Sequence, residues 1–331
     1  MSYFTSTLQA LAPLFALILI GYGLKRRRIL HASHVPVMNG LVINVTLPAL
    51  IIHGFASAPR IPLTDTLPAV SAFLSEIVVM ALAYVIGRAC RLPQRTVGML
   101  MLISAFPNTG FLGYPMVLAL FKDQMPSAII LDQFGEAMPL VVSALLIGPA
   151  MGGKQGSEEQ TGTRFQRLQA QSFRVIKTLR TPLTYALAVG VAVRLIPWPA
   201  GLAAMPDVRE IGSVLMQILQ YLAQGTVPIV LLALGVSLRP SSLKGDARPV
   251  VIASTLKLMV VPLIAYLLAR RFGLHGDIMH VAVLQCAMPT AVMASVYAAQ
   301  SNLDGEKAVG IVFVTTVLSA VTVPFLLGIL H

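Results

Sequence analysis

Four ionisable residues stand within long apolar runs of this sequence, where a charge is costly: Glu76, Asp132, Glu136 and Lys257. A charged side chain in the hydrocarbon of a membrane costs several kcal/mol unless it is paired or hydrated, so each one marks a candidate functional site. One interpretation makes Lys257 the countercharge of a bound anion and Glu76 or Glu136 a proton acceptor. The other pairs the lysine with a glutamate as a structural ion pair, and the sequence does not decide between them.

Polar groups at similar depth widen the set of candidates. Asp132 lies nearer the end of its apolar run and is expected to reach water. Gln133 and Gln285 can hydrogen-bond a ligand or join two helices, and residue type alone does not separate these roles. The candidates for binding a coupled ion, either H+ or Na+, are three acids and one amide: Glu76, Asp132, Glu136 and Gln285.

Two of the apolar runs contain a proline beside residues that typically begin helices: AFPNTGFLGYP, with Pro107, and QCAMPTAVMAS, with Pro289. Proline removes a backbone donor and clashes with the preceding turn, while Asn108, Thr109 and Thr290 are good N-cap residues. One such proline would be an ordinary kink, but two in matching contexts favour helices that stop and restart. If both breaks meet at mid-membrane, two helix N-termini point N–H groups into one cavity, which favours an anion. The candidate binding residues of the breaks are Pro107, Asn108, Thr109, Gly110, Pro289 and Thr290.

The elements that must hold these residues are membrane helices. Of 331 residues, 56% are hydrophobic and 11% charged, whereas soluble domains are nearer a quarter charged. Runs long enough to cross about 30 Å of hydrocarbon recur along the whole chain. The sequence predicts an all-α polytopic membrane protein of ten transmembrane helices: Leu8–Leu24, Val35–Phe55, Leu67–Ile86, Val97–Leu120, Ser127–Ala150, Pro182–Ile196, Leu219–Leu238, Pro249–Ala269, Ile278–Ala298 and Ala308–Leu330.

An internal repeat relates the two halves of the chain at a constant offset. Pro107 recurs as Pro289, 182 positions later (289 − 107), and the same offset maps Ala83, Tyr84 and Arg88 onto Ala265, Tyr266 and Arg270. Duplication explains matches at corresponding points of corresponding runs. We expect a first five-helix repeat over 1–150, a polar cytoplasmic linker over 151–178 and a second five-helix repeat over 179–331. Because five is odd, the second repeat enters the membrane inverted.

The net charge of +11 raises the question of nucleic-acid binding, but the distribution of the basic residues indicates a membrane topology instead. Most of them cluster in the loops of one side, such as Lys25 to Arg28 after the first run. The positive-inside rule then places both termini outside and the central loop in the cytoplasm of a multi-pass cell-membrane protein. A polar start followed by apolar residues, Asp207 to Ile218, is expected to lie at the outer surface before the chain turns inward.

The sequence lacks the motifs that typically mark an enzyme or a metal-binding protein. The spans contain no HExxH, GxSxG or paired-aspartate protease motif, so we expect no enzyme activity. The two cysteines, Cys90 and Cys286, indicate no disulfide or thiolate–metal framework. We expect neither a metal nor a cofactor.

Several segments together are similar to one family. In the first half these are LPAL from Leu47 with His53, and FPNT from Phe106; in the second they are RTPLTYALAVG, LALGVSLRP, LKLMVVPLIAYLLARRFGLHGD and VAVLQCAMPTAVMASVYAAQ. The chain resembles the auxin efflux carrier family, which includes the plant PIN-formed carriers and many bacterial permeases. The resemblance runs from the first to the tenth predicted span.

The resemblance implies a fold and a mechanism. Members have ten transmembrane helices in two inverted five-helix repeats with broken crossover helices, here the fourth and ninth spans. They carry small organic anions between a scaffold and a transport domain that moves like an elevator. Carried over by position, the two breaks form the substrate site, and Ile52, His53 and Gln133 lie near the bound anion.

Two differences separate this chain from the plant carriers: Thr290 replaces a glutamine after the second proline, and the central loop is short. These differences argue against auxin as the substrate. The resemblance to bacterial members that carry short-chain dicarboxylates makes malate or malonate the preferred substrate. The alternative function is a sodium- or proton-coupled cation or solute transporter that uses the intramembrane acids. The expected partners are a small organic anion and the lipid bilayer, without nucleic acid, while H+ or Na+ coupling and a homodimer stay open.

Overall fold

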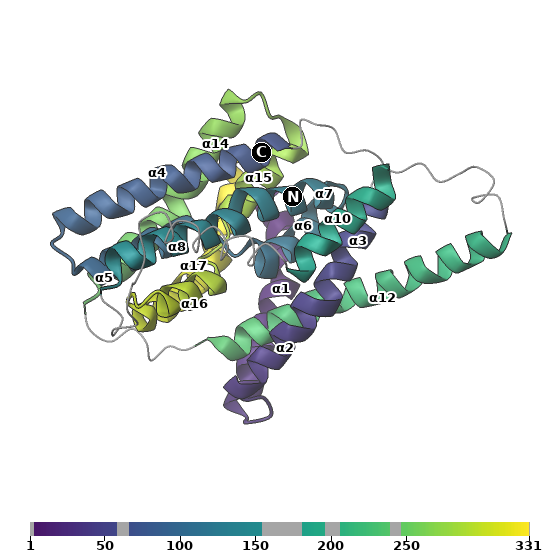
Figure 1. The fold of residues 1–331 in the computed structure, drawn as a ribbon, viewed down its shortest axis with the longest axis horizontal. Helices are drawn as coiled ribbons and strands as arrows, with labels where there is room; N and C mark the ends of the chain where they lie inside the picture. The colour runs from purple at the N-terminus through teal and green to yellow at the C-terminus, as the bar shows by residue number, and fades with distance from the viewer. Residues whose placement is uncertain (1–2, 58–65, 154–180, 196–205, 239–245, 331) are drawn as a thin grey trace, which may run out of the picture. The chain divides into compact units, whose positions relative to one another are not determined.

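The computed structural model describes residues 3–57, 66–153, 181–195, 206–238 and 246–330. The described residues are almost entirely helical and contain no strand, so the chain is an all-α protein (Figure 1). Six of the described segments are long and apolar enough to cross a membrane: Ala32–Ser57, Leu67–Ala89, Lys122–Met151, Asp207–Ser237, Arg248–Arg271 and Gly305–Ile329. The protein is therefore a multi-pass membrane protein. The predicted linker lies outside the described residues beyond position 153.

The chain forms two compact units, and each unit combines segments from both halves of the sequence. Unit 1 comprises residues 1–11, 63–179 and 238–331. Its helices in the first half are α4 (Leu67–Ala89), α5 (Gln94–Ala105), η4 (Thr109–Gly113), α6 (Tyr114–Leu120), η5 (Lys122–Gln124), α7 (Met125–Ile130), η6 (Leu131–Ala137) and α8 (Met138–Met151). Its helices in the second half are α13 (Arg248–Thr255), η8 (Leu256–Val260), α14 (Val261–Arg271), α15 (Gly276–Cys286), α16 (Val292–Gln300) and α17 (Gly305–Leu330).

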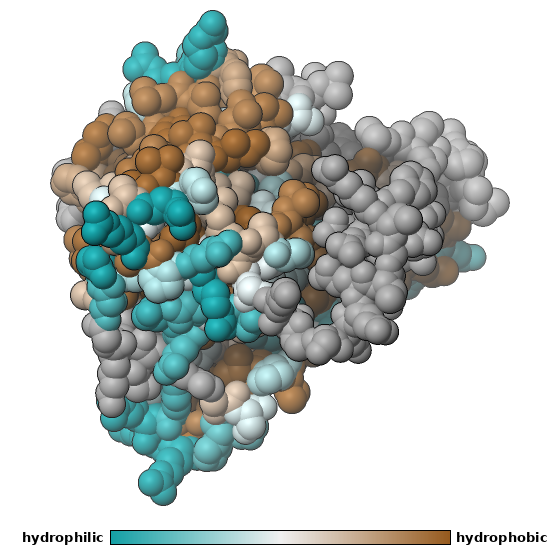
Figure 2. Space-filling model, turned by 60° about the vertical axis from the view of Figure 1, so that its left-hand side comes forward, coloured by the Kyte–Doolittle hydropathy of each residue, from teal (hydrophilic) through white to brown (hydrophobic). Residues whose placement is uncertain are grey.

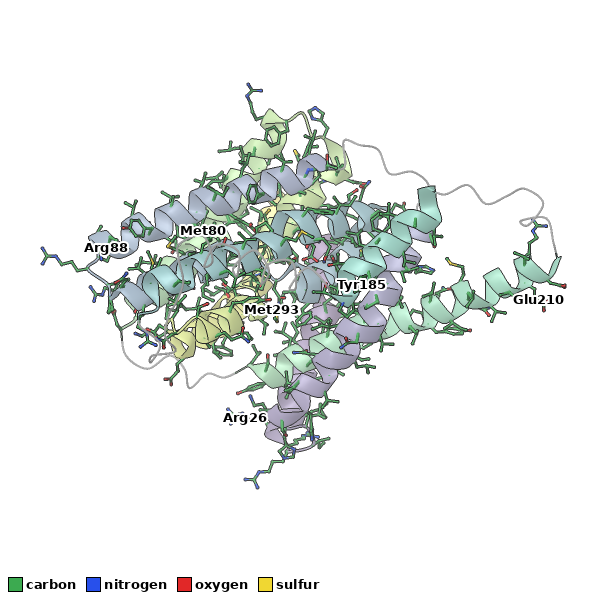
Figure 3. The ribbon with its side chains drawn as sticks, in the orientation of Figure 1. Arg26, Met80, Arg88, Tyr185, Glu210 and Met293 are labelled. Atoms are coloured by element: carbon green, nitrogen blue, oxygen red, sulfur yellow. The ribbon has the colours of Figure 1, made fainter. Side chains whose placement is uncertain are left out.

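Unit 2 comprises residues 12–62 and 180–237. Its helices are most of α1 (Tyr3–Arg26), then η1 (Ala32–His34), α2 (Val35–Leu41), η2 (Val42–Thr46), α3 (Leu47–Ser57), α10 (Pro182–Leu195) and α12 (Pro206–Ser237). Figure 3 labels Tyr185 on α10 and Glu210 near the start of α12. The sequence predicts a surface segment that ends at Ile218, followed by a turn into the next span. This prediction is wrong, because α12 continues through Ile218 as one helix.

Glycines let α1 and α12 approach closely within unit 2. A Cβ on Gly21 would lie 2.3 Å from the carbonyl oxygen of Leu232, and one on Gly235 would lie 2.0 Å from that of Ile18. Side chains cannot occupy such distances, so the two backbones are in contact. Small residues commonly permit this packing between membrane helices.

The sequence offset of 182 recurs in the helix boundaries of unit 1. Helix α5 begins at Gln94 and α15 at Gly276 (276 − 94 = 182), while α4 ends at Ala89 and α14 at Arg271 (271 − 89 = 182). Both α4 and α14 end in the same Schellman pattern, with a residue in the left-handed region: Arg91 at φ 54° and Gly273 at φ 74°.

The hydrogen bonds of these two helix ends match as well. The N–H of Leu92 donates to the carbonyl of Gly87 at 3.0 Å, and that of Leu274 donates to the carbonyl of Ala269 at 2.9 Å. Both the donors and the acceptors are 182 positions apart. Corresponding segments of the two halves thus end their helices in the same way.

The core of unit 1 is apolar, and so is much of its outer surface. Ala83 of α4 and Ala265 of α14 are fully buried, whereas Phe73 and Val85 of α4 and Leu263 of α14 are exposed. Figure 2 shows hydrophobic residues gathered in broad brown areas with hydrophilic residues, in teal, at their margins. An apolar outer face is expected of helices surrounded by lipid.

Candidate functional site

The helix breaks predicted at Pro107 and Pro289 are confirmed. Helix α5 ends at Ala105 and η4 restarts at Thr109; α15 ends at Cys286 and α16 restarts at Val292. Figure 3 labels Met293 on α16, just after the second break. We call residues 106–108 the first break and residues 287–291 the second break. Both breaks lie in unit 1.

The two breaks pair with each other as a short antiparallel bridge. The N–H of Asn108 donates to the carbonyl of Pro289 at 2.7 Å, and the N–H of Ala291 donates to the carbonyl of Phe106 at 3.0 Å. Irregular backbone at membrane depth must find partners inside the protein because lipid offers none. Each break thus supplies hydrogen-bond partners for backbone groups of the other. The two interrupted helices are therefore in contact at their breaks.

The predicted capping roles of the break residues are wrong. Asn108 occupies the position before η4, but its side chain makes no capping bond. The hydroxyl of Thr109 donates to Asp132, and the hydroxyl of Thr290 donates to the carbonyl of Ile103 at 2.9 Å. The threonines join helices instead of capping them, and the Nδ2 of Asn108 has no hydrogen-bond partner among the described residues.

Lys257 is fully buried and bonds to the ends of both interrupted helices. Its Nζ donates to the carbonyl of Cys286 at 2.9 Å and to that of Ala105 at 3.4 Å. These residues end α15 and α5, where carbonyls lack helical partners and the helix dipole is negative. An ammonium group at this position provides a hydrogen-bond donor for the last carbonyls of both helices.

The structural ion pair, one of the two interpretations left open for Lys257, is not formed as a direct contact. The salt bridges of the described residues, at 4.0 Å or less, do not include this lysine. Glu136 and Glu76 nevertheless face its charge. The lysine therefore acts on the two glutamates through space and on the breaks through hydrogen bonds.

Asp132 is buried on η6, at 5% exposure, so the expectation that it reaches water is wrong. Its carboxylate accepts from the hydroxyl of Thr109, from the hydroxyl of Tyr114 at 2.6 Å and from the Nε2 of Gln133 at 2.9 Å. Three donors can hold a buried carboxylate in its charged form. Asp132 thereby ties η6 to the helix that restarts after the first break.

Sequence reasoning missed Tyr114 as a member of this group. It is fully buried, and a buried tyrosine hydroxyl needs a partner. Its position five residues after Thr109 in an apolar run was the available signal. The acceptor was not evident, because Asp132 lies 18 residues further along the chain.

Glu76 of α4 and Glu136 of η6 are buried, at 1% and 2% exposure. The structure brings them together, and their carboxyl groups interact. The two acids can approach each other because α4 and η6 pack closely at Gly135. A Cβ on this glycine would lie 2.8 Å from the carbonyl oxygen of Ala69 and 3.2 Å from the Cβ of Ala72. In Figure 3, Met80 marks the position one turn beyond Glu76 on α4.

Gln285 of α15 is fully buried, and neither atom of its amide has a hydrogen-bond partner among the described residues. It packs against Gly113, where a Cβ would lie 1.8 Å from its Oε1. Gln133, by contrast, is already bonded to Asp132. Of the predicted amides, Gln285 and Asn108 are the ones that the described residues leave available to a ligand.

Three predicted residues lie on elements other than those described above or at their margins. Gly110 follows the first break and is partly exposed. Ile52 and His53 lie on α3, in unit 2. No group of three or more His, Cys, Asp or Glu side chains within the described ranges is arranged to hold a metal ion.

Comparison with known proteins gives consistent matches along the whole chain. The family model described as membrane transport protein matches residues 6–327. The chain is 26% identical to an uncharacterized transporter of Methanothermobacter thermautotrophicus, over 97% of each chain. It is 29% identical to an uncharacterized transporter of Methanocaldococcus jannaschii, over 93% of each chain. It is 27% identical to a protein of Rhizobium meliloti named "Putative malonate transporter", over 96% of this chain and 94% of that one.

Proposed function

The chain belongs to the membrane transport protein family, the family of the auxin efflux carriers, and on this basis we propose that it is a secondary transporter of a small organic anion across the cell membrane. The anion binds beside the paired helix breaks of unit 1. A dicarboxylate is the preferred substrate because the Rhizobium meliloti relative is named for malonate. The observation that carries the proposal is the antiparallel pairing of the two breaks through Asn108 and Pro289.

The breaks supply donors suited to a carboxylate. The N–H groups of Leu112 and Gly113 bond to the carbonyl of Asn108. The N–H groups of residues 109–111 precede these bonds and therefore have no acceptor within the first restarted helix. The side chains of Asn108 and Gln285 add amide donors. Asp132 also approaches this helix start, but its carboxyl oxygens already accept hydrogen bonds from three donors.

The proposed architecture is ten transmembrane helices in two inverted five-helix repeats, over 1–150 and 179–331. Matching helix ends at the offset of 182 support the duplication. Inversion is supported by the antiparallel bridge, because the corresponding breaks of the two halves run in opposite directions. Both termini lie outside and the central loop lies in the cytoplasm, in accordance with the distribution of basic residues.

We propose that the protein exposes its binding site to the two sides of the membrane in turn by an elevator movement. The division of the chain supports this assignment, because unit 1 holds both breaks and unit 2 takes the remaining segment of each half. Unit 1 is then the transport domain and unit 2 the scaffold. Elevator carriers commonly fix their scaffolds against each other, and a homodimer through unit 2 follows by analogy.

Thermal stabilisation of the purified protein across a panel of anions and cations tests this function. Malonate or a related dicarboxylate is expected to stabilise the wild type, because a ligand that binds only the folded state raises its stability. The shift is expected to be lost in Asn108→Ala and retained in Asn44→Ala, whose side chain bonds within its own helix in unit 2. Stabilisation by sodium without any carboxylate, lost in Glu76→Gln, would instead establish the alternative of a cation-coupled solute transporter.

A further inference from the structure

The carboxyl groups of Glu76 and Glu136 face each other and lack the donors that buried carboxylates need. Both oxygens of Glu76 and the Oε2 of Glu136 have no hydrogen-bond partner among the described residues. The Oε1 of Glu136 has only the thiol of Cys286, at 3.9 Å. Asp132, one turn before Glu136 on the same helix, has three donors. Asp132 thus has a full set of hydrogen-bond donors, whereas the neighbouring Glu76–Glu136 pair has almost none.

One proton would satisfy the unpartnered pair. Two ionised carboxylates have no donor between them and repel each other, and the repulsion is strong where water is excluded. When one of the two is protonated, its O–H can donate to the other, and the pair carries a single negative charge. Carboxyl pairs that share a proton occur for the same reason in aspartic proteases.

The charges around the pair favour this one-proton state. The groups that face it are Lys257 of η8, Asp132 of η6 and the Cys286 thiol of α15. With Asp132 ionised and the pair singly protonated, two negative charges stand against the one positive charge of Lys257, and the three donors of Asp132 stabilise its charge. Loss of the proton adds a further buried negative charge that has neither a donor nor a countercharge, and such a charge is costly in a membrane.

A proton suits this site better than a sodium ion. Lys257 already places a positive charge beside the carboxylates, which repels a second cation. A proton also supplies the donor that the two carboxyl groups lack, which a sodium ion cannot do. We propose that the Glu76–Glu136 pair binds one proton that is transported together with the anion; this inference rests on the proposed transport function.

The pair is linked to the substrate site through the ends of the interrupted helices. Lys257 bonds to the carbonyls of Ala105 and Cys286, directly before the two breaks. When the proton leaves, its O–H bond breaks, the electron pair stays on the carboxylate oxygen, and water accepts the proton. A domain loaded with both anion and proton carries less net charge across the membrane than one loaded with the anion alone, so joint loading favours its movement.

Malonate uptake into proteoliposomes with the membrane potential clamped at zero tests the coupling. An outside pH lower by one unit is expected to drive about tenfold accumulation in the wild type, since one proton per anion makes the two gradients equal in free energy. Glu76→Gln and Glu136→Gln are expected to exchange malonate but to lose this accumulation. Glu306→Gln, the same change at an exposed position of α17, is expected to keep it. Accumulation driven by sodium, or a pH response that survives in both glutamine variants, overturns the proposal.

A second measurement does not depend on transport. At neutral pH exposed carboxyl groups, with pKa values of about 4, are ionised, so the infrared carbonyl band of a carboxylic acid reports on buried groups. The band is expected in the wild type and in Glu306→Gln and is expected to be absent from the Glu76→Gln, Glu136→Gln double variant. Persistence of the band in the double variant overturns the proton site. If the band is lost but malonate is never transported, the proton site stands and the proposed substrate is wrong.

Discussion

The backbone N–H of Asn108 donates to the carbonyl oxygen of Pro289 at 2.7 Å, which joins the two helix breaks directly. Both prolines lack an N–H, so the irregular backbone around them depends on such bonds across the breaks. The bond uses only the main chain of Asn108. Its side chain remains free for a ligand, with Nδ2 lacking a partner among the described residues.

Asn108→Ala is therefore expected to weaken anion binding without disturbing the fold. Removing one amide donor to a charged ligand costs about 1.5–3 kcal/mol, or roughly a tenfold to hundredfold loss of affinity. Titration of the thermal shift with malonate measures this loss, and the yield of monodisperse protein reports on folding. Equal affinity in the variant and the wild type would show that the site lies elsewhere.

Lys257→Met is expected to reduce the stability of unit 1 strongly. Methionine has a similar length but no charge, so the carbonyls of Ala105 and Cys286 lose a donor and the two buried glutamates lose their cation. Removing one member of a buried charged group costs about 3–5 kcal/mol. Thermal unfolding in detergent measures the effect.

The control for this change is Lys307→Met. The Nζ of Lys307 bonds to Asp304 at 2.9 Å, but both side chains are partly exposed. Such a pair contributes about 0–1 kcal/mol, so this variant should unfold near the wild-type temperature. A similar loss in the two lysine variants would contradict the role assigned to Lys257.

Local chemistry predicts part of this structure from the sequence. The breaks at Pro107 and Pro289 follow from the missing N–H of proline, which acts within its own helix wherever that helix lies. The offset of 182 likewise recurs at the ends of α4 and α14, because each end depends on a few neighbouring residues. The continuous course of α12 was not predicted, because its polar beginning also suits a separate surface helix.

The site required contacts that sequence spacing does not reveal. Thr109 and Thr290 have typical capping side chains, yet neither caps its helix, because tertiary acceptors take their hydroxyl groups. Lys257 finds its acceptors 152 and 29 positions away, at Ala105 and Cys286. Only the folded chain shows that one lysine serves both interrupted helices.

Gly113→Ala is expected to displace Gln285 and to lower stability by about 1–3 kcal/mol, because the new methyl group would overlap its side-chain oxygen. Gly110→Ala has nothing within 4 Å of the added Cβ and replaces glycine with a better helix former. Its thermal unfolding temperature should equal or exceed that of the wild type. A loss of stability in Gly110→Ala but not in Gly113→Ala would contradict the packing at Gln285.

Gly235→Ala is expected to separate α1 from α12 and to destabilise unit 2. The added Cβ would lie 2.0 Å from the carbonyl oxygen of Ile18 and 2.8 Å from the nitrogen of Tyr22. Both are backbone atoms that cannot rotate away, so a loss of at least about 1–3 kcal/mol is expected. Gly212→Ala on the same helix has open space around its Cβ, and the same thermal measurement should show no loss there.

Asp132→Asn tests the distinction between the buried acid that has hydrogen-bond donors, Asp132, and the buried acids of unit 1 that lack them. An ionised carboxylate accepts from Thr109, Tyr114 and Gln133 together, whereas an amide offers one acceptor oxygen and turns its NH2 group toward donors. Hydrogen bonds to a charged group contribute about 1.5–3 kcal/mol each, and an unsatisfied buried donor adds a further cost. We therefore expect a large fall in the thermal unfolding temperature.

Glu76→Gln is the matched comparison, because it makes the same chemical change at a carboxyl group that the described residues leave without donors. A glutamine amide can donate to the carboxylate of Glu136, as a protonated glutamate would. The Glu76→Gln protein should therefore unfold close to the wild-type temperature near neutral pH. If Asp132→Asn proved harmless and Glu76→Gln strongly destabilising, the assignment of Asp132 to structure and of the glutamate pair to the proton would have to be reversed.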